Sequence, residues 1–202
     1  MGEVDASKRM LRESILAVRA RLTARDAEAT ATVLAERALE LPELAEARTV
    51  AAYVSVGREP GTRPLLEALR TRGVRVLLPV LLPDNDLDWG VYEGADRLVR
   101  AGRGLLEPDG PRAGPDAVTG VDAVLLPGLA VDGSGVRLGR GGGSYDRVLA
   151  RLGAAGARPV LAVLLYDAEL VGSVPAEPHD LPVAAAVTPS EIHRFTAPPP
   201  HR

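Results

Sequence analysis

The passage from Val121 to Leu152 constrains the fold more than any other part of the chain. It begins with "VDAVLLPGLAV" (Val121–Val131), which has the composition of a buried β-strand. Glycine then fills five of the nine positions from Gly135 to Gly143. A helical pattern follows, with one face formed by Tyr145, Val148, Leu149 and Leu152. The passage therefore predicts a strand, a glycine loop and a helix, with Ser144 as the N-cap and Gly153 at the helix end.

Strand and helix patterns alternate along the rest of the chain as well. Further helical patterns cover Ala6–Leu22, Asp26–Leu41 and Thr62–Arg72. Strand patterns cover Thr49–Val56, Val74–Val80, Leu87–Tyr92, Arg158–Tyr166 and Leu181–Thr188, whereas Gly94–Gly120 is poorly patterned. This alternation predicts an α/β three-layer sandwich with a largely parallel, Rossmann-like central sheet. We expect residues 1–202 to form a single domain in which 197–202 is a flexible tail.

Composition narrows the class of protein. The net charge of −3 argues against general binding to nucleic acid or to anionic membranes. The absence of cysteine excludes disulfides and thiolate metal sites. The first residues, "MGEVDASKRMLRES", are too charged for a secretory signal, and no apolar run reaches the ~18 residues of a membrane span. The three histidines, His179, His193 and His201, form no metal-like cluster. We therefore expect a cytoplasmic, monomeric protein that acts on small molecules.

Lys8 is the only lysine among 24 basic residues, all the others being arginine. On the first predicted helix, Lys8, Arg12 and Arg19 fall along one flank of the apolar stripe. They can form a solvated face, and a single lysine near an exposed terminus can be chance. The alternative is a site that needs a compact ammonium, which a planar guanidinium cannot replace.

The glycine segment has the features of an anion-binding loop. Glycine lets phosphate oxygens approach the main chain, and a helix N-terminus directs N–H groups toward them. Arg137 and Arg140 would add charge-assisted hydrogen bonds. The spacing matches neither the P-loop nor the dinucleotide fingerprint, and a flexible hairpin remains the alternative. Asp146 would repel phosphates unless Mg²⁺ bridges the two, or it simply complements the helix dipole.

The string "LLPGLAVDGSGVRLGRGGGSYDR" closely resembles the signature of the 5-formyltetrahydrofolate cyclo-ligase (5,10-methenyltetrahydrofolate synthetase) family. Three shorter motifs occur in the order that this family has. Lys8 and Arg12 match its Lys-x-x-x-Arg, Glu59 and Thr62 match its Glu-x-x-Thr, and "VPAEPHDLPV" resembles its closing motif and contains Asp180. The resemblance implies ATP-dependent cyclisation of 5-formyltetrahydrofolate to 5,10-methenyltetrahydrofolate, with release of ADP and phosphate.

The resemblance also implies roles for individual residues. The implied ATP ligands are Lys8, Arg12, Arg137, Leu138, Gly139, Arg140, Gly141, Gly142, Gly143, Ser144 and Tyr145. The implied folate contacts are Val54, Glu59, Arg140, Gly141, Gly142, Gly143 and Ser144. Arg140, Tyr145 and Asp146 would be catalytic, and Asp146 and Asp180 would associate with Mg²⁺. The partners implied are thus ATP and a reduced folate.

Three positions depart from the family pattern, and other functions stay open. Many relatives have an aromatic residue at Ser144 and some a lysine at Gly142, while Ala184 stands where Asp is common. Trp89 can stack on a pterin, although a single Trp more often lies in a core. The alternatives are a non-catalytic nucleotide or folate sensor, and a sugar-phosphate isomerase or acyl-CoA transferase on a similar scaffold. A transferase of this kind would require a nucleophilic glutamate in the loop, and the segment Arg137–Asp146 contains no glutamate.

The contrast between Lys8 and its neighbour Arg9 gives a test that needs only conservative substitutions. If Lys8 binds ATP phosphates, Lys8→Arg should raise the KM for ATP or lower kcat about tenfold, because a forked guanidinium does not fit an ammonium site. Arg9→Lys lies about 100° around the helix and should leave both parameters unchanged. Steady-state kinetics on both variants decides the matter. Parent-like kinetics for Lys8→Arg would leave the first helix with a structural role only.

Overall fold

A seven-stranded sheet forms the centre of the protein. The computed structural model describes residues 3–177 and 181–195, so Asp180 and the tail expected at 197–202 lie outside the described residues. The strands of this sheet are β1 (Thr49–Ala51), β2 (Arg75–Leu81), β3 (Leu87–Val91), β6 (Ala123–Leu126), β9 (Val160–Leu164), β11 (Ala185–Val187) and β12 (Ile192–Arg194). They lie in the order β12-β11-β9-β6-β1-β2-β3. All neighbours pair in parallel except the edge strands β3 and β12, which confirms the largely parallel sheet.

The strand order reverses between β1 and β6. From β1 the chain moves outward to β2, whereas from β6 it moves the other way to β9 and β11. Since parallel strands are joined by right-handed crossovers, a reversal places the two sets of connecting helices on opposite faces of the sheet. It also leaves a crevice beyond the carboxyl ends of the two strands at the switch, where ligands of such folds bind. In this protein the crevice lies between β1 and β6.

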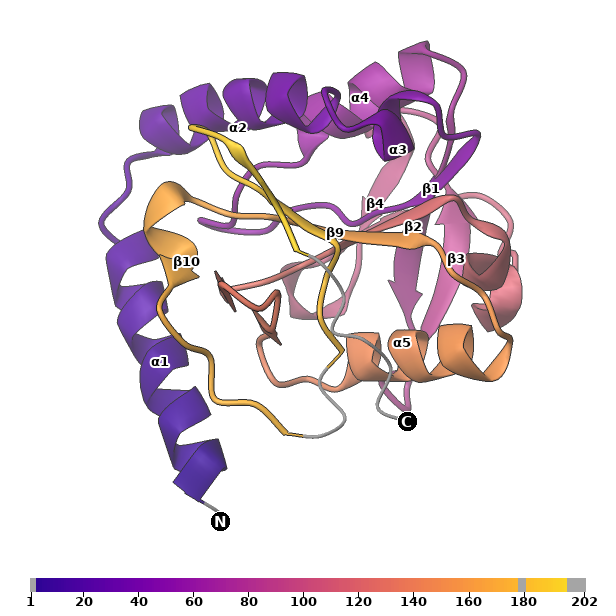
Figure 1. The fold of residues 1–202 in the computed structure, drawn as a ribbon. Coiled ribbons are helices and arrows are strands. Elements are labelled where there is room, and N and C mark those ends of the chain that lie inside the picture. Colours follow the sequence, from indigo (N-terminus) through magenta and orange to yellow (C-terminus); the bar gives the residue numbers. More distant parts are fainter. Residues whose placement is uncertain (1–2, 178–180, 196–202) are drawn as a thin grey trace.

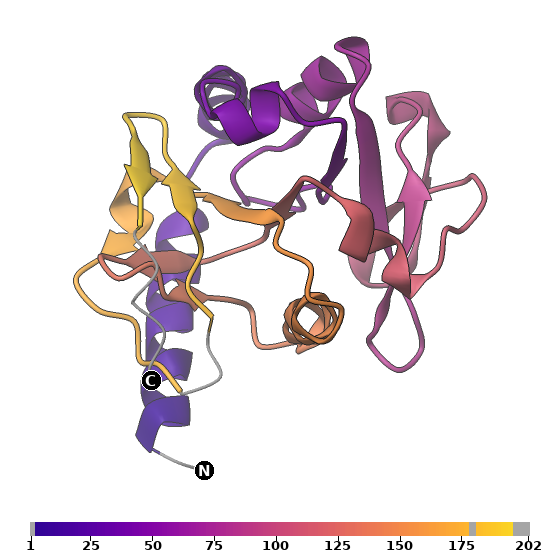
Figure 2. The ribbon, with the colours of Figure 1, turned by 45° about the vertical axis from the view of Figure 1, so that its right-hand side comes forward.

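Helices cover both faces of the sheet (Figure 1). The helices are α1 (Glu3–Arg19), α2 (Ala24–Ala38), α3 (Pro42–Ala45), α4 (Arg63–Thr71) and α5 (Ser144–Ala154). One apolar core joins α2 and α4 to the sheet, and a second core joins α5 to the opposite face. Figure 2 shows α5 almost end-on beneath the sheet. The expected three layers are therefore confirmed, and no helix in residues 3–177 or 181–195 is long and apolar enough to cross a membrane.

The expected strand Val121–Val131 is wrong as a single element. It divides into β6 and β7 (Ala130–Asp132), and β7 belongs to a separate three-stranded sheet with β8 (Arg137–Leu138) and β10 (Leu170–Val171). The break falls at Pro127, which has no N–H for a ladder, and at Gly128, where a Cβ would lie 2.8 Å from Val163. Helix α1 packs its apolar stripe on this small sheet in a third apolar core.

Several other boundaries differ from the sequence expectations. Helix α1 begins three residues early, Gly143 rather than Ser144 is the N-cap of α5, and α5 runs through Gly153. The unpatterned stretch contains a short hairpin, β4 (Leu98–Arg100) with β5 (Leu106–Pro108), and its turn includes a 3-10 helix. That helix is Gly102–Gly104, and the other 3-10 helices among the described residues are Ala95–Arg97, Pro115–Gly120 and Asp167–Glu169. The regular part of the first strand ends at Ala51, and β12 was not expected at all.

Gly61 gives a stability test, because it lies where the turn after β1 touches α2. A Cβ at this position would overlap the Cβ of Ala31, which cannot move without moving the helix. Gly61→Ala should therefore lower the free energy of unfolding by about 1–3 kcal/mol. Gly153→Ala is the matched control: it lies within α5 with nothing within 4 Å of the added Cβ, and should be neutral or stabilise by about 0.5–1 kcal/mol. Chemical denaturation of the three proteins measures both differences, and equal stabilities would contradict the close approach.

Candidate functional site

A pocket of about 510 Å³ lies at the crevice between β1 and β6. It gathers segments that are far apart in the sequence, namely α1, the residues after β1, the ends of β2 and β3, and the loop before α5. Of the residues predicted from the sequence, those lining the pocket are Lys8, Arg12, Val54, Glu59, Arg137, Leu138, Gly139, Arg140, Gly141, Gly142, Gly143, Ser144, Tyr145 and Asp146. The structure thus brings together every predicted site residue that it describes. Asp180 is the remaining one and lies outside the described residues.

The glycine loop lies between β8 and α5 and is held by Arg12. The Nε atom of Arg12 donates a hydrogen bond to the Gly139 carbonyl at 2.9 Å. Gly141 has a φ of +84°, and a Cβ there would lie 3.3 Å from the Arg12 guanidinium. Gly143 is also left-handed, and no side-chain hydrogen bond caps the first turn of α5. Glycine is therefore needed for the backbone path, and the helix N-terminus is suited to an anion.

Arg137 and Asp146 occupy opposite environments at the two ends of this loop. The Arg137 side chain is only 9% exposed, and its Nη1 donates to the Pro127 carbonyl at 2.8 Å. Its Nη2 lies 3.8 Å from Oδ1 of Asp146, whose side chain is 66% exposed. The cation is fixed beneath the loop, while the carboxylate stays accessible at the mouth.

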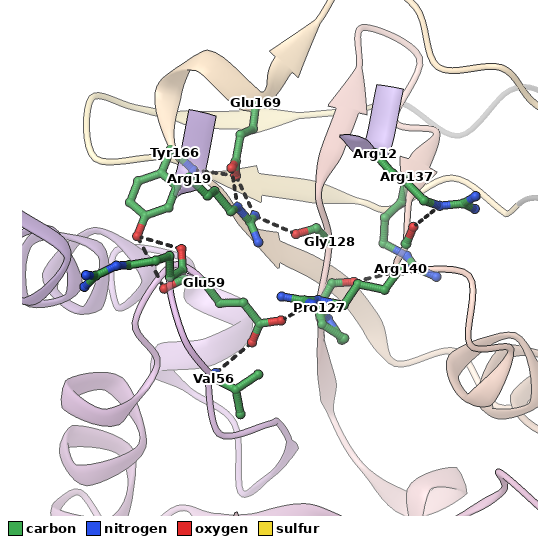
Figure 3. A network of polar contacts seen from close by, with 12 residues as sticks. Arg12, Arg19, Val56, Glu59, Pro127, Gly128, Arg137, Arg140, Tyr166 and Glu169 are labelled. Atoms are coloured by element: carbon green, nitrogen blue, oxygen red, sulfur yellow. Dashed lines mark hydrogen bonds and ion pairs between the residues drawn. The ribbon is translucent and has the colours of Figure 1, made fainter. Parts of the chain in front are cut away.

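Glu59 connects the turn after β1 to the glycine loop (Figure 3). Its side chain is 8% exposed, and Oε1 accepts a hydrogen bond from Nε of Arg140 at 2.9 Å. The other oxygen, Oε2, accepts from the Val56 N–H at 2.9 Å. The predicted folate-contacting carboxylate is thus oriented by two donors, one of which comes from the predicted ATP loop.

Lys8 is buried in the wall of the pocket and does not belong to a solvated face. Its side chain is 10% exposed, and Nζ lies 3.0 Å from Oε2 of Glu177. Because Glu177 follows the small sheet, this ion pair connects α1 to a distant part of the chain. Lys8 therefore occupies a specific, buried position in the pocket wall.

Two tyrosines bring phenol groups to the pocket. The Tyr145 hydroxyl is buried and has no hydrogen-bond partner among the described residues. Burial raises the pKa of Tyr145, and burial likewise raises the pKa of Tyr53, so both phenols stay protonated at neutral pH. A buried hydroxyl without a hydrogen-bond partner destabilises the folded state, and such groups are rare in native proteins. A ligand that pairs with the Tyr145 hydroxyl would explain why it is retained.

Other pocket residues were not predicted. They are Asp5, Tyr53, Val56, Pro79, Leu81, Leu87, Arg103, Leu105, Leu106, Pro127 and Glu177. The leucines form an apolar wall from the ends of β2 and β3 and from the short hairpin. Sequence spacing could not identify these residues, because the elements that carry them come together only in the folded protein. Trp89 is fully buried in the core between α5 and the sheet and does not line the pocket.

Asp146 is the predicted metal-associated residue that the structure describes. The described residues contain no group of three or more His, Cys, Asp or Glu side chains that could hold an ion. Mg²⁺, however, is commonly bound by one or two carboxylates together with waters and substrate phosphates, rather than by a protein cage. One exposed carboxylate beside an anion-binding loop fits that second mode, and Asp146 provides it.

Fold and site together define a class: doubly wound α/β proteins with a cation-lined pocket at the strand-order switch. Comparison with known proteins specifies the family. A profile of the 5-formyltetrahydrofolate cyclo-ligase family matches residues 4–189. The chain belongs to this family, which confirms the resemblance seen in its motifs.

Individual relatives agree with this assignment. The 5-formyltetrahydrofolate cyclo-ligase of Mycolicibacterium smegmatis is 47% identical over 147 residues, covering 70% of this chain and 74% of that protein. The enzyme of the same name from Escherichia coli K12 is 36% identical over 160 residues, covering 78% and 87%. The structure of Aquifex aeolicus 5,10-methenyltetrahydrofolate synthetase superposes with a TM-score of 0.78 at 26% identity, covering 96% of each chain.

The unpartnered hydroxyl of Tyr145 gives a prediction that separates stability from activity. Tyr145→Phe should leave the free energy of unfolding unchanged or raise it by up to about 1 kcal/mol, because it removes an unsatisfied buried group. If a bound ligand normally pairs with that hydroxyl, kcat/KM should fall at least about tenfold. Thermal unfolding and turnover are measured on the same preparation. A loss of stability with full activity would show that the hydroxyl has a structural partner instead.

Proposed function

We propose that the protein catalyses the ATP-dependent cyclisation of 5-formyltetrahydrofolate to 5,10-methenyltetrahydrofolate, with release of ADP and phosphate. One observation carries the proposal: Arg140 of the glycine loop and Glu59 of the turn after β1 form an ion pair at 2.9 Å within a single pocket. A nucleotide held by the loop and a folate held by the turn would therefore share that pocket. Family membership supports the same reaction.

The two substrates would occupy different walls of the pocket. We assign the nucleotide phosphates to Lys8, Arg12 and the loop Arg137–Tyr145, where the cations and the N-terminus of α5 lie. The folate ring would lie against Val54 and Glu59 and border Arg140–Ser144, with the leucine wall covering its apolar parts. Glu59 is suited to accept hydrogen bonds from pterin N–H groups, because a carboxylate has acceptor sites beyond the two already used.

The chemistry requires little covalent participation by the protein. The formyl oxygen of the folate attacks the γ-phosphorus of ATP, and the bond between that phosphorus and ADP breaks. N10 then attacks the activated formyl carbon and loses its proton, the bond between that carbon and the phosphorylated oxygen breaks, and the oxygen and the proton leave as hydrogen phosphate. Arg137 and Arg140 would stabilise charge on the transferring phosphoryl group, and the Tyr145 phenol would act as a neutral hydrogen-bond donor.

Asp146 is the residue that we expect to engage Mg²⁺, together with Asp180 of the closing motif, whose Glu177 lines the pocket. When bound with the nucleotide, Mg²⁺ would neutralise phosphate charge. The protein's part is to present an accessible carboxylate next to the loop, and the exposed Asp146 side chain meets that need. A monomeric state and a cytoplasmic location remain predictions from the sequence.

Absorbance of the methenyl product, followed with and without ATP and Mg²⁺, tests the proposal directly. The parent protein should form product only when 5-formyltetrahydrofolate, ATP and Mg²⁺ are all present, with one ADP released per product. A non-catalytic sensor would bind both ligands and form no product. An isomerase or a transferase would leave ATP unconsumed.

Asp146→Asn is the informative variant in the same assay. It should lower turnover strongly at limiting Mg²⁺ and recover partly at high Mg²⁺, because an amide is a weaker ligand for this hard cation. Its stability should change by no more than about 1 kcal/mol, since the side chain is 66% exposed at a helix terminus. Parent-like activity at limiting Mg²⁺ would contradict the metal assignment and leave Asp146 as a helix-terminal acid.

A further inference from the structure

Arg19 and Glu169 form a buried ion pair behind the pocket. Nε and Nη2 of Arg19 donate to the two carboxylate oxygens of Glu169 at 2.6 and 2.8 Å, and both side chains are at most 5% exposed. Nη2 of Arg19 also donates to the Gly128 carbonyl at 2.9 Å. A buried pair with additional hydrogen bonds fixes geometry more than it adds stability. The pair therefore holds the segment after β9 to α1 and to the link between β6 and β7.

Tyr166 extends this buried pair toward the turn that carries Glu59 (Figure 3). Its backbone N–H donates to Oε2 of Glu169 at 3.0 Å, and the Arg19 guanidinium lies 5.8 Å from the centre of its ring. The hydroxyl lies 3.3 Å from the carbonyls of both Arg58 and Glu59. Burial raises the pKa of Tyr166, so the hydroxyl keeps the proton that these carbonyls share.

We propose that Tyr166, held by the Arg19–Glu169 pair, is a positioning residue for the folate substrate. Its hydroxyl donates a hydrogen bond to the backbone carbonyl of Glu59, while Arg140 and the Val56 N–H donate to the side-chain carboxylate of the same residue. Tyr166 does not line the pocket, so it acts only through Glu59. This inference rests on the proposed function, because it names which substrate the turn receives.

This arrangement implies that loss of the Tyr166 hydroxyl would weaken binding of the folate more than binding of ATP. The turn is fixed at both ends of Glu59, whereas the proposed ATP ligands Lys8 and Arg12 are held by other partners, Glu177 and the Gly139 carbonyl. Loss of the Tyr166 hydroxyl should loosen the turn and leave those partners in place. A role limited to general stability would affect both substrates alike.

Tyr166→Phe tests the proposal, with Tyr92→Phe as the matched control. The Tyr92 hydroxyl contacts Glu67 of α4 at 3.4 Å, and Tyr92 does not line the pocket. Tyr166→Phe should raise the Kd and KM for 5-formyltetrahydrofolate about three- to tenfold, as expected for one hydrogen bond. The Kd for ATP and kcat at saturation should stay within twofold of the parent values. Tyr92→Phe should change none of them.

Calorimetric titration with each ligand alone, kinetics and thermal unfolding give distinguishable outcomes. Parent-like folate binding by Tyr166→Phe would overturn the positioning role while leaving the proposed function intact. An equal loss of ATP and folate affinity, or a lower Tm with unchanged affinities, would also overturn it. If the parent binds 5-formyltetrahydrofolate but forms no product, the proposed function fails and the titrations still test Tyr166. If the parent does not bind 5-formyltetrahydrofolate, both fail.

Discussion

The reversal of strand order between β1 and β6 is the constraint on which the rest of the structure depends. It sends α4 and α5 to opposite faces and leaves the carboxyl ends of two adjacent strands without a helix between them. The turn after β1 and the bend after β6 meet in that space. Glu59, from one side, and Arg137 and Arg140, from the other, lie in one pocket because of the topology rather than because of their sequence spacing.

Four cations in the pocket are each held by a carboxylate or by a backbone carbonyl. Arg140 pairs with Glu59, Lys8 pairs with Glu177, and Arg137 and Arg12 donate to the carbonyls of Pro127 and Gly139. Each contact joins residues on different elements, so the cations that would repel one another also hold α1, the small sheet and the loop together. A prearranged set of donors of this kind needs little rearrangement when an anion binds, which favours both affinity and catalysis.

The sequence predicted the layers well, because they depend on local patterns, and the predicted site residues that the structure describes line a single pocket. Apolar periodicity identified α1, α4, α5 and the parallel strands, and the glycine loop could be recognised from residues within ten positions of one another. Features that depend on nonlocal packing were missed. The apolar run at Val121–Val131 has the pattern of a single strand. Its division at Pro127 was missed, because the carbonyls of Pro127 and Gly128 are bound by Arg137 and Arg19, which lie on other elements. Tyr166 and Glu169 had no sequence signal, and Glu177 was not predicted to contact Lys8 although it belongs to the motif "VPAEPHDLPV", since the partners of all three lie more than 100 residues away.

The burial of Lys8 has a chemical consequence for the whole molecule. Because the chain contains no other lysine, its single ε-amino group lies in the pocket wall with a side chain only 10% exposed, and every other side-chain cation is a guanidinium. Apart from the α-amino group, the exterior therefore offers no amine to acylating reagents, to reducing sugars or to enzymes that acetylate or ubiquitinate lysine. Apart from its reaction with that α-amino group, covalent chemistry selective for amines would thus report on the pocket.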